Sequence, residues 1–185
     1  MLKKGIILFM MDLGKDSKII VRVLFFCILF IAFLVNTGEV FCKTFSTWDV
    51  FELDKCASIW LIKRFIDTEA EIKFFPKGTT ISEGTPFDTP EAKLRRYHNM
   101  STFECFLKFY DLKDPKLHSI GKIIHDIEIN IWEKKVYTET LNVQNAILSI
   151  IDQSESLAVI VEEYSRYFDS LYERISPDLT SRNPY

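Results

Sequence analysis

Histidine and carboxylate side chains recur in this sequence at spacings that suit a metal ion. The chain has three histidines. His125 and Glu128 stand three residues apart, which places both on one face of a helix, and His98 comes shortly before Glu104. Imidazole together with carboxylate is a donor set that suits zinc, manganese or iron. We therefore predict a divalent metal site formed by His98, Glu104, His125 and Glu128.

Further charged side chains accompany this set. Asp54 and Asp126 are expected behind the metal, where carboxylates orient metal ligands. Lys55 and Arg64 supply positive charge, which suits an oxyanion as an alternative ligand. The partner of the domain is thus a small ion or a small molecule.

Each of these residues also has a structural interpretation, which stays open at this point. Asp54 stands where a helix N-cap belongs. Glu104 is the acid of a capping box that begins at Ser101. His125 is a cation near a helix C-terminus, where the macrodipole favours it.

The elements that position these residues follow from hydrophobic periodicity. Residues 54–67 (DKCASIWLIKRFID) have the apolar spacing of a core helix, with Trp60 buried in its centre. Residues 45–53 precede it as a strand with Trp48 and Val50 inward, and residues 70–76 follow it as a second strand. Such a strand–helix–strand unit favours parallel pairing.

Four helices are expected after a loop in which residues 85–88 form a short third strand. A capping box at residues 101–104 and the Asp114–Pro115 pair mark two helix starts. Residues 141–151 and 156–174 keep helical spacing. The fold class is α+β, predominantly helical, with a small β-sheet of two or three strands near the start of the domain packed against four to five helices.

The first 42 residues differ from the rest. A basic flank leads into an apolar run at residues 23–35, which is shorter than the roughly 20 residues that span a bilayer but typical of a secretory signal. We predict a signal peptide at 1–42 and an exported, periplasmic domain at 43–175 with a loose tail at 176–185. A membrane anchor at residues 19–35 and a core helix of a cytosolic protein are the alternatives.

Composition limits the possible functions. With 185 residues, of which 48% are hydrophobic, the chain can build one ordinary domain. Its net charge of −3 and the absence of a basic stripe argue against nucleic acid as a partner, and contact with a membrane is expected only through the N-terminal segment. Cys56 and Cys105 either pair in an oxidising compartment or pack as buried thiols.

Several spaced motifs resemble the chromate-resistance exported protein family, whose domain also forms the C-terminal half of bacterial chromate-resistance regulatory proteins. They are DKCASIWLIKRFID at 54–67, PFD at 86–88, STFE at 101–104 after His98, IIHDIE at 123–128 and FDSLY at 168–172. The resemblance covers about residues 48–171. Lys55 replaces the usual arginine, Ser58 stands where many members have cysteine, and Glu128 stands for the usual aspartate.

The resemblance implies a role in lowering chromate accumulation, without an agreed reaction. The leading hypothesis is an exported domain that binds a divalent metal or an oxyanion in a polar pocket walled by Trp60 and the later helices. A metal-dependent enzyme with a non-chromate substrate is the first rival. A noncatalytic sensor or interaction module is the second, and the sequence does not decide whether the protein is an enzyme.

Overall fold

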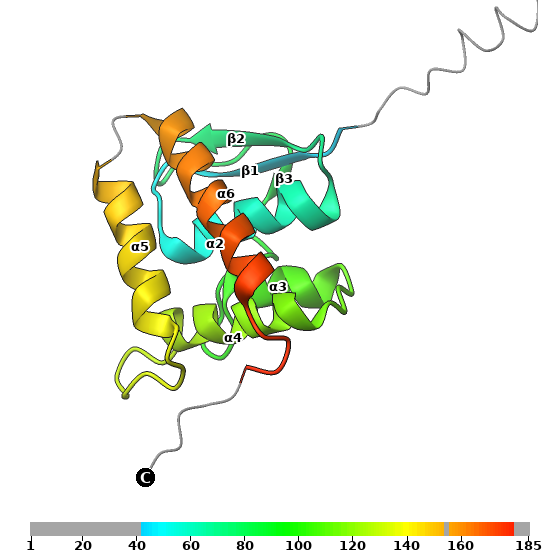
Figure 1. The fold of residues 1–185 in the computed structure, drawn as a ribbon. Helices are drawn as coiled ribbons and strands as arrows, with labels where there is room; N and C mark the ends of the chain where they lie inside the picture. Colours follow the sequence, from blue (N-terminus) through cyan, green and yellow to red (C-terminus); the bar gives the residue numbers. More distant parts are fainter. Residues whose placement is uncertain (1–41, 154–155, 180–185) are drawn as a thin grey trace, which may run out of the picture. The chain divides into compact units, whose positions relative to one another are not determined.

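A computed structural model describes residues 42–153 and 156–179 of the chain (Figure 1). The predicted signal peptide and its alternatives therefore lie outside the described residues, apart from Cys42. In the described part, no helix has the length and apolar character needed to cross a membrane. The elements are, in order, β1 (Thr44–Trp48), α2 (Leu53–Leu61), the π-helix η1 (Ile62–Ile66), β2 (Glu71–Phe75), β3 (Thr85–Pro86), α3 (Thr102–Phe109), α4 (Pro115–Glu128), α5 (Thr140–Gln153) and α6 (Leu157–Arg174).

The strands form a parallel sheet in the order β2-β1-β3. Its edge strand β3 is only two residues long. Gly84, just before β3, has a φ of +74°, and a Cβ there would lie 2.5 Å from Ser46 Oγ. Glycine is required at this point because the turn must approach β1 closely and adopt a left-handed backbone. The predicted fold class, with its small sheet near the start of a mostly helical domain, is confirmed.

The prediction for the side chains of the first strand is wrong. Phe45, Ser46 and Thr47 are all buried, while Trp48 and Val50 are half-buried. The alternation fails because β1 is the central strand, and a central parallel strand is covered on both faces. Trp48 instead lies at the carboxyl end of β1, where its Nε1 donates to Thr79 O at 2.9 Å.

Helix α2 is the centre of the core. Each of its residues is buried, and it packs against α3, α4, α5 and α6. Figure 1 shows α6 running across α2. At this crossing the Trp60 ring stacks on Phe168 with centroids 5.5 Å apart, and its Nε1 donates to Asp169 Oδ1 at 2.7 Å. The prediction that Trp60 is a core residue agrees with its exposure of 1%.

The predicted starts of two helices are confirmed. Ser101 and Glu104 form a reciprocal capping box at α3. Asp114 caps α4 by accepting from Lys116 N and Leu117 N, with Pro115 in the first turn. Asp54, in contrast, is not the N-cap of its own helix, because α2 begins at Leu53 and its N-cap residue is Glu52.

The described cysteines are unpaired, and Cys56 and Cys105 are buried. Of the tail predicted to be loose, residues 176–179 are described. Leu179 is 8% exposed and belongs to the core, and Ser119 Oγ donates to Pro177 O at 3.0 Å. The domain core therefore receives side chains from Phe45 through Leu179.

Candidate functional site: a cationic pocket at the start of α2

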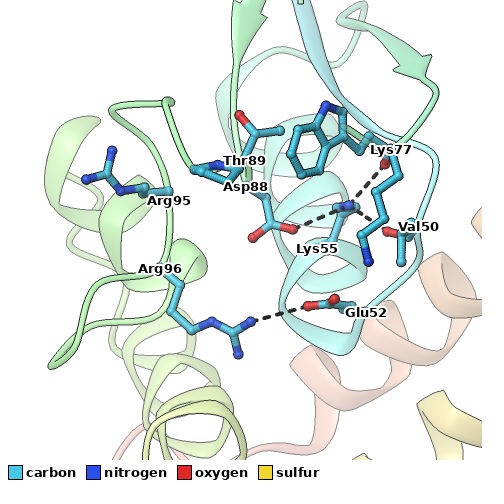
Figure 2. Close-up of a pocket in the computed structure, with 10 residues that line it drawn as sticks. Val50, Glu52, Lys55, Lys77, Asp88, Thr89, Arg95 and Arg96 are labelled. Atoms are coloured by element: carbon cyan, nitrogen blue, oxygen red, sulfur yellow. Dashed lines mark hydrogen bonds and ion pairs between the residues drawn. The ribbon is translucent and has the colours of Figure 1, made fainter. Parts of the chain in front are cut away.

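A pocket of about 250 Å³ opens between the end of β1, the first turn of α2 and the loops that follow β2 and β3. Figure 2 shows the side chains around it. Its volume lies just below the roughly 300 to 1,000 Å³ of sites for drug-sized ligands, so it has room for a small ligand. The lining residues are Trp48, Val50, Glu52, Lys55, Lys77, Asp88, Thr89, Pro90, Arg95 and Arg96.

Lys55 places a fixed positive charge in this pocket. The first turn of α2 carries it, and its side chain is 3% exposed. Its Nζ donates to Trp48 O at 3.0 Å and to Val50 O at 2.5 Å, and it lies 3.5 Å from Asp88 Oδ2. An ammonium group has three hydrogens, so these partners hold Lys55 in one orientation.

Asp88 faces Lys55 from a strained stretch of backbone. Its φ is +50°, a left-handed conformation that aspartate tolerates better than most residues. Its Oδ1 accepts from Thr102 Oγ1 at 2.8 Å, and its own N–H donates to Leu94 O at 2.8 Å. Burial raises the pKa of Asp88, although the Lys55 ammonium lowers it. The loop thus fixes this carboxylate between α2 and α3.

Asp54 caps a different helix from its own. It is 1% exposed, and its two carboxyl oxygens accept from Thr102 N at 2.6 Å and Phe103 N at 2.9 Å. The capping box satisfies the N–H groups of Ser101 and Glu104. The N–H groups of residues 101–104 are therefore all bonded, although the first N–H groups of a helix have no partner within it. Asp54 fastens the start of α3 to α2.

Arg96 joins two acids at the pocket edge. Its Nη1 pairs with Glu128 Oε2, and its Nη2 lies 3.3 Å from Glu52 Oε2. Glu128 ends α4, and Glu52 is the N-cap residue of α2. Burial raises the pKa of Glu128, while Arg96 lowers it. This network links the C-terminus of α4 to the N-terminus of α2.

Two further cations lie on the pocket wall. In Figure 2 the Lys77 side chain extends beside Lys55 and Val50, while the Arg95 guanidinium points away from them. Arg95 Nη1 donates to Ala92 O at 2.9 Å. Lys77 Nζ has no hydrogen bond or ion pair with any of the described residues. Its charge is therefore available to a ligand.

The pocket carries more positive than negative charge. Four lining side chains are basic and two, Glu52 and Asp88, are acidic. Behind them, burial and the neighbouring Asp88 raise the pKa of Asp54 to about 8, so this carboxyl group is largely neutral at pH 7. A small anion is the ligand that this balance favours.

The structure does not bring the four predicted metal ligands together. His125 Nδ1 lies 2.9 Å from Glu104 Oε2. Glu128 is paired with Arg96, and His98 is exposed in the loop before α3. Among residues 42–153 and 156–179 no group of three or more His, Cys, Asp or Glu side chains could hold a metal ion. Metal binding by this protein stays a prediction.

Asp126 has a structural role. It accepts from Asn130 Nδ2, Val136 N, Tyr137 N and Thr140 Oγ1 at distances between 2.6 and 3.3 Å. Burial acts to raise the pKa of Asp126, but these hydrogen bonds outweigh it and the pKa is lowered. The residue orders the connection between α4 and α5.

Arg64 lies away from the pocket, on η1. Its Nε and Nη2 donate to the two carboxyl oxygens of Asp169 on α6, at 2.9 and 2.8 Å. The same carboxylate accepts from Trp60. Arg64 and Trp60 therefore fasten α6 to the first core helix, and neither lines the pocket.

Sequence reasoning selected Asp54 and Lys55 but did not select Lys77, Asp88 or Arg96 as site residues. Asp88 belongs to the PFD motif, and Arg96 belongs to an arginine pair in a loop. The sequence feature that could have indicated Arg96 as a site residue is this pair of charged residues in a loop. Lys77 follows Pro76 and carries no comparable signal in the sequence.

Residues from four of the sequence motifs meet around this pocket. Asp54 and Lys55 come from the first, Asp88 from PFD, Thr102 from STFE, and Glu128 from IIHDIE. A family model described as "ChrB, C-terminal domain" matches residues 45–175, a range that contains the whole pocket. No curated protein and no solved structure matches the chain.

Proposed function

The chain belongs to the ChrB C-terminal domain family, a chromate-resistance family, and from this membership we propose that its cationic pocket binds a small oxyanion of the chromate type. Its role is chromate-related, as the family's is. The observation that carries the proposal is the unpaired ammonium group of Lys77 beside the fixed charge of Lys55, in a pocket of about 250 Å³.

The basic side chains of the pocket have two roles. Some contribute only a fixed positive charge, and others donate hydrogen bonds to the bound anion. The three hydrogens of the Lys55 ammonium group are engaged by Trp48 O, Val50 O and Asp88. Lys55 therefore attracts the anion by its charge and does not donate a hydrogen bond to it. Lys77 is available, and Arg96, whose side chain is 40% exposed, uses part of its guanidinium on Glu52 and Glu128. A guanidinium has five N–H donors, which leaves donors for an oxyanion.

The oxyanion proposal predicts a specific loss of affinity. Lys77→Gln should weaken binding of chromate or sulfate at least tenfold, because hydrogen bonds to charged groups contribute about 1.5 to 3 kcal/mol. Isothermal titration calorimetry at low ionic strength measures the dissociation constant, and added NaCl should weaken binding further by screening.

Lys108→Gln is the matched control. Lys108 is exposed on α3 and does not line the pocket, so this variant has the same change in net charge and should bind like the unmodified protein. Equal affinities for the Lys77→Gln and Lys108→Gln proteins would contradict the oxyanion site.

Export is the second part of the proposal. The support is the sequence of residues 1–42, where a basic flank precedes the apolar run at 23–35, as in secretory signals. Fusing residues 1–42 to a reporter enzyme that is active only outside the cytoplasm should give activity. Replacing Ile28 and Phe30 with aspartate interrupts the apolar run and should abolish it. Activity that survives this change, or none from the original fusion, would overturn export.

A further inference from the structure

A second pocket, of about 400 Å³, adjoins the cationic one. The two share Trp48, Thr89 and Pro90 as lining residues. Trp48 is fixed between them, because its Nε1 donates to Thr79 O at 2.9 Å. The half-buried indole thus belongs to both pockets at once.

Apolar side chains form half of the lining of the second pocket. Ile81, Pro86 and Ala92 join Trp48 and Pro90 there, and Glu91 is the one charged residue among the lining residues. The remaining lining residues are Gly78, Thr79, Thr80 and Thr89. This composition differs from that of the first pocket, where six of the lining side chains are charged. Ligand sites commonly combine apolar walls with a few placed polar groups.

We propose that the two pockets form one site for a small organic anion with an aryl body. The anionic head lies near Lys77 and Arg96, and the aryl body lies in the second pocket against Trp48. This inference rests on the proposed oxyanion site, which supplies the head group's position. An inorganic oxyanion would occupy only the first pocket and leave the apolar wall in contact with water.

Two physical effects favour binding of the aryl body in the second pocket. Moving it from water to the apolar wall removes apolar surface from solvent. An indole also prefers to meet another ring in an offset-stacked or edge-to-face arrangement. Neither effect is available to sulfate or inorganic phosphate. The affinity difference between an aryl phosphate and inorganic phosphate, compared where both are dianions, therefore reports the contribution of the aryl body.

The test compares phenyl phosphate with inorganic phosphate by isothermal titration calorimetry on the full chain. At pH 8 both head groups are mainly dianions, so the aryl body is the principal difference between the two ligands, and we expect it to make phenyl phosphate bind at least tenfold more tightly. In the Trp48→Ala protein this ratio should fall to within about twofold of unity, whatever happens to the affinity for inorganic phosphate, because Trp48 lines both pockets. Trp132→Ala is the control, since Trp132 is 91% exposed and lines neither pocket.

Ile81→Asn gives a second route to the same answer if the Trp48→Ala protein does not fold. Ile81 lies in the loop between β2 and β3 and lines only the second of the two pockets, so its replacement should also reduce the ratio. A ratio near one in the unmodified protein, or one that survives both replacements, would overturn the aryl pocket. Failure of Lys77→Gln to weaken either ligand would overturn the oxyanion site instead.

Discussion

Protonation of the Asp54 carboxyl group links the charge behind the pocket to the stability of the domain. The carboxyl group accepts two backbone N–H groups of α3 at 2.6 and 2.9 Å while buried beside Asp88. Burial and the Asp88 charge raise the pKa of Asp54 from 3.8 to about 8. The folded protein therefore holds a proton there over a pH range in which the unfolded chain has released it.

This difference predicts a pH dependence of unfolding. The stabilisation from a raised pKa is complete below the unfolded value of 3.8 and is lost as the pH rises through about 8. The free energy of unfolding should thus fall with rising pH, by at most about 1.4 kcal/mol per pH unit from this one group. Urea titrations between pH 4 and pH 8 measure the slope.

Asp54→Asn should make that slope shallower. Part of it should remain, because burial also raises the pKa values of Asp88 and Glu128. Asp152→Asn on α5 is the control, since Asp152 is exposed. A slope that is the same with and without the Asp54 carboxyl group would show that it does not bind the proton.

At the scale of elements, the crossing of α2 and α6 is held by one buried indole. Trp60 stacks on Phe168 and donates a hydrogen bond to Asp169. Arg64 on η1 donates hydrogen bonds to the same carboxylate. Trp60 and Arg64 are four residues apart, so both reach Asp169 from the same face. The charge of Arg64 therefore serves the packing of α6 against the first core helix.

Trp60→Ala should destabilise the domain by about 3 to 5 kcal/mol, the range for truncating a large buried aromatic side chain. Trp132→Ala should change the stability by less than about 0.5 kcal/mol, because exposed side chains without partners contribute little. Chemical denaturation of both variants gives the comparison. A loss below about 1 kcal/mol for Trp60→Ala would contradict its place at the centre of the core.

The sequence predicts correctly those elements that are specified by residues close together in the chain. Ser101 with Glu104, and Asp114 with Pro115, cap the helices in which they stand, and both starts were predicted correctly. Asp54 was assigned to the wrong helix because its partners, Thr102 and Phe103, lie 48 and 49 residues away. No local pattern records such a pairing.

The same reason explains what was missed at the site. Lys55 lies on a periodic helix and was selected, whereas Lys77 and Asp88 lie in loops, where residue types carry no period. Trp48 was expected inside because a single strand cannot reveal that it will become the central one. The proximity of the pocket residues is a property of the tertiary fold.

At the scale of the whole molecule, one core unites the described residues. It extends from Phe45 in the sheet to Leu179 after α6, and α2 contacts the four other α-helices. With a shared core, neither the sheet nor the last two helices has an apolar interior of its own. The domain should unfold as one unit.

We therefore expect residues 43–185 to unfold in urea with a single midpoint. Far-UV circular dichroism reports the helices and near-UV circular dichroism reports the packing of the aromatic side chains, and the two curves should coincide. Leu171→Ala on α6, 2% exposed in the native protein, should shift both curves together. Separate midpoints would mean that the sheet and the last helices are independent units.

The burial of the thiols bears on oxidation. Chromate is an oxidising anion, and the form of cysteine that gives up electrons readily is the thiolate. Burial raises the pKa values of Cys56 and Cys105, so both stay protonated and out of reach in the native domain. Among the described cysteines only Cys42, before β1, is exposed. The folded domain can therefore meet such an anion repeatedly while its interior remains chemically reduced.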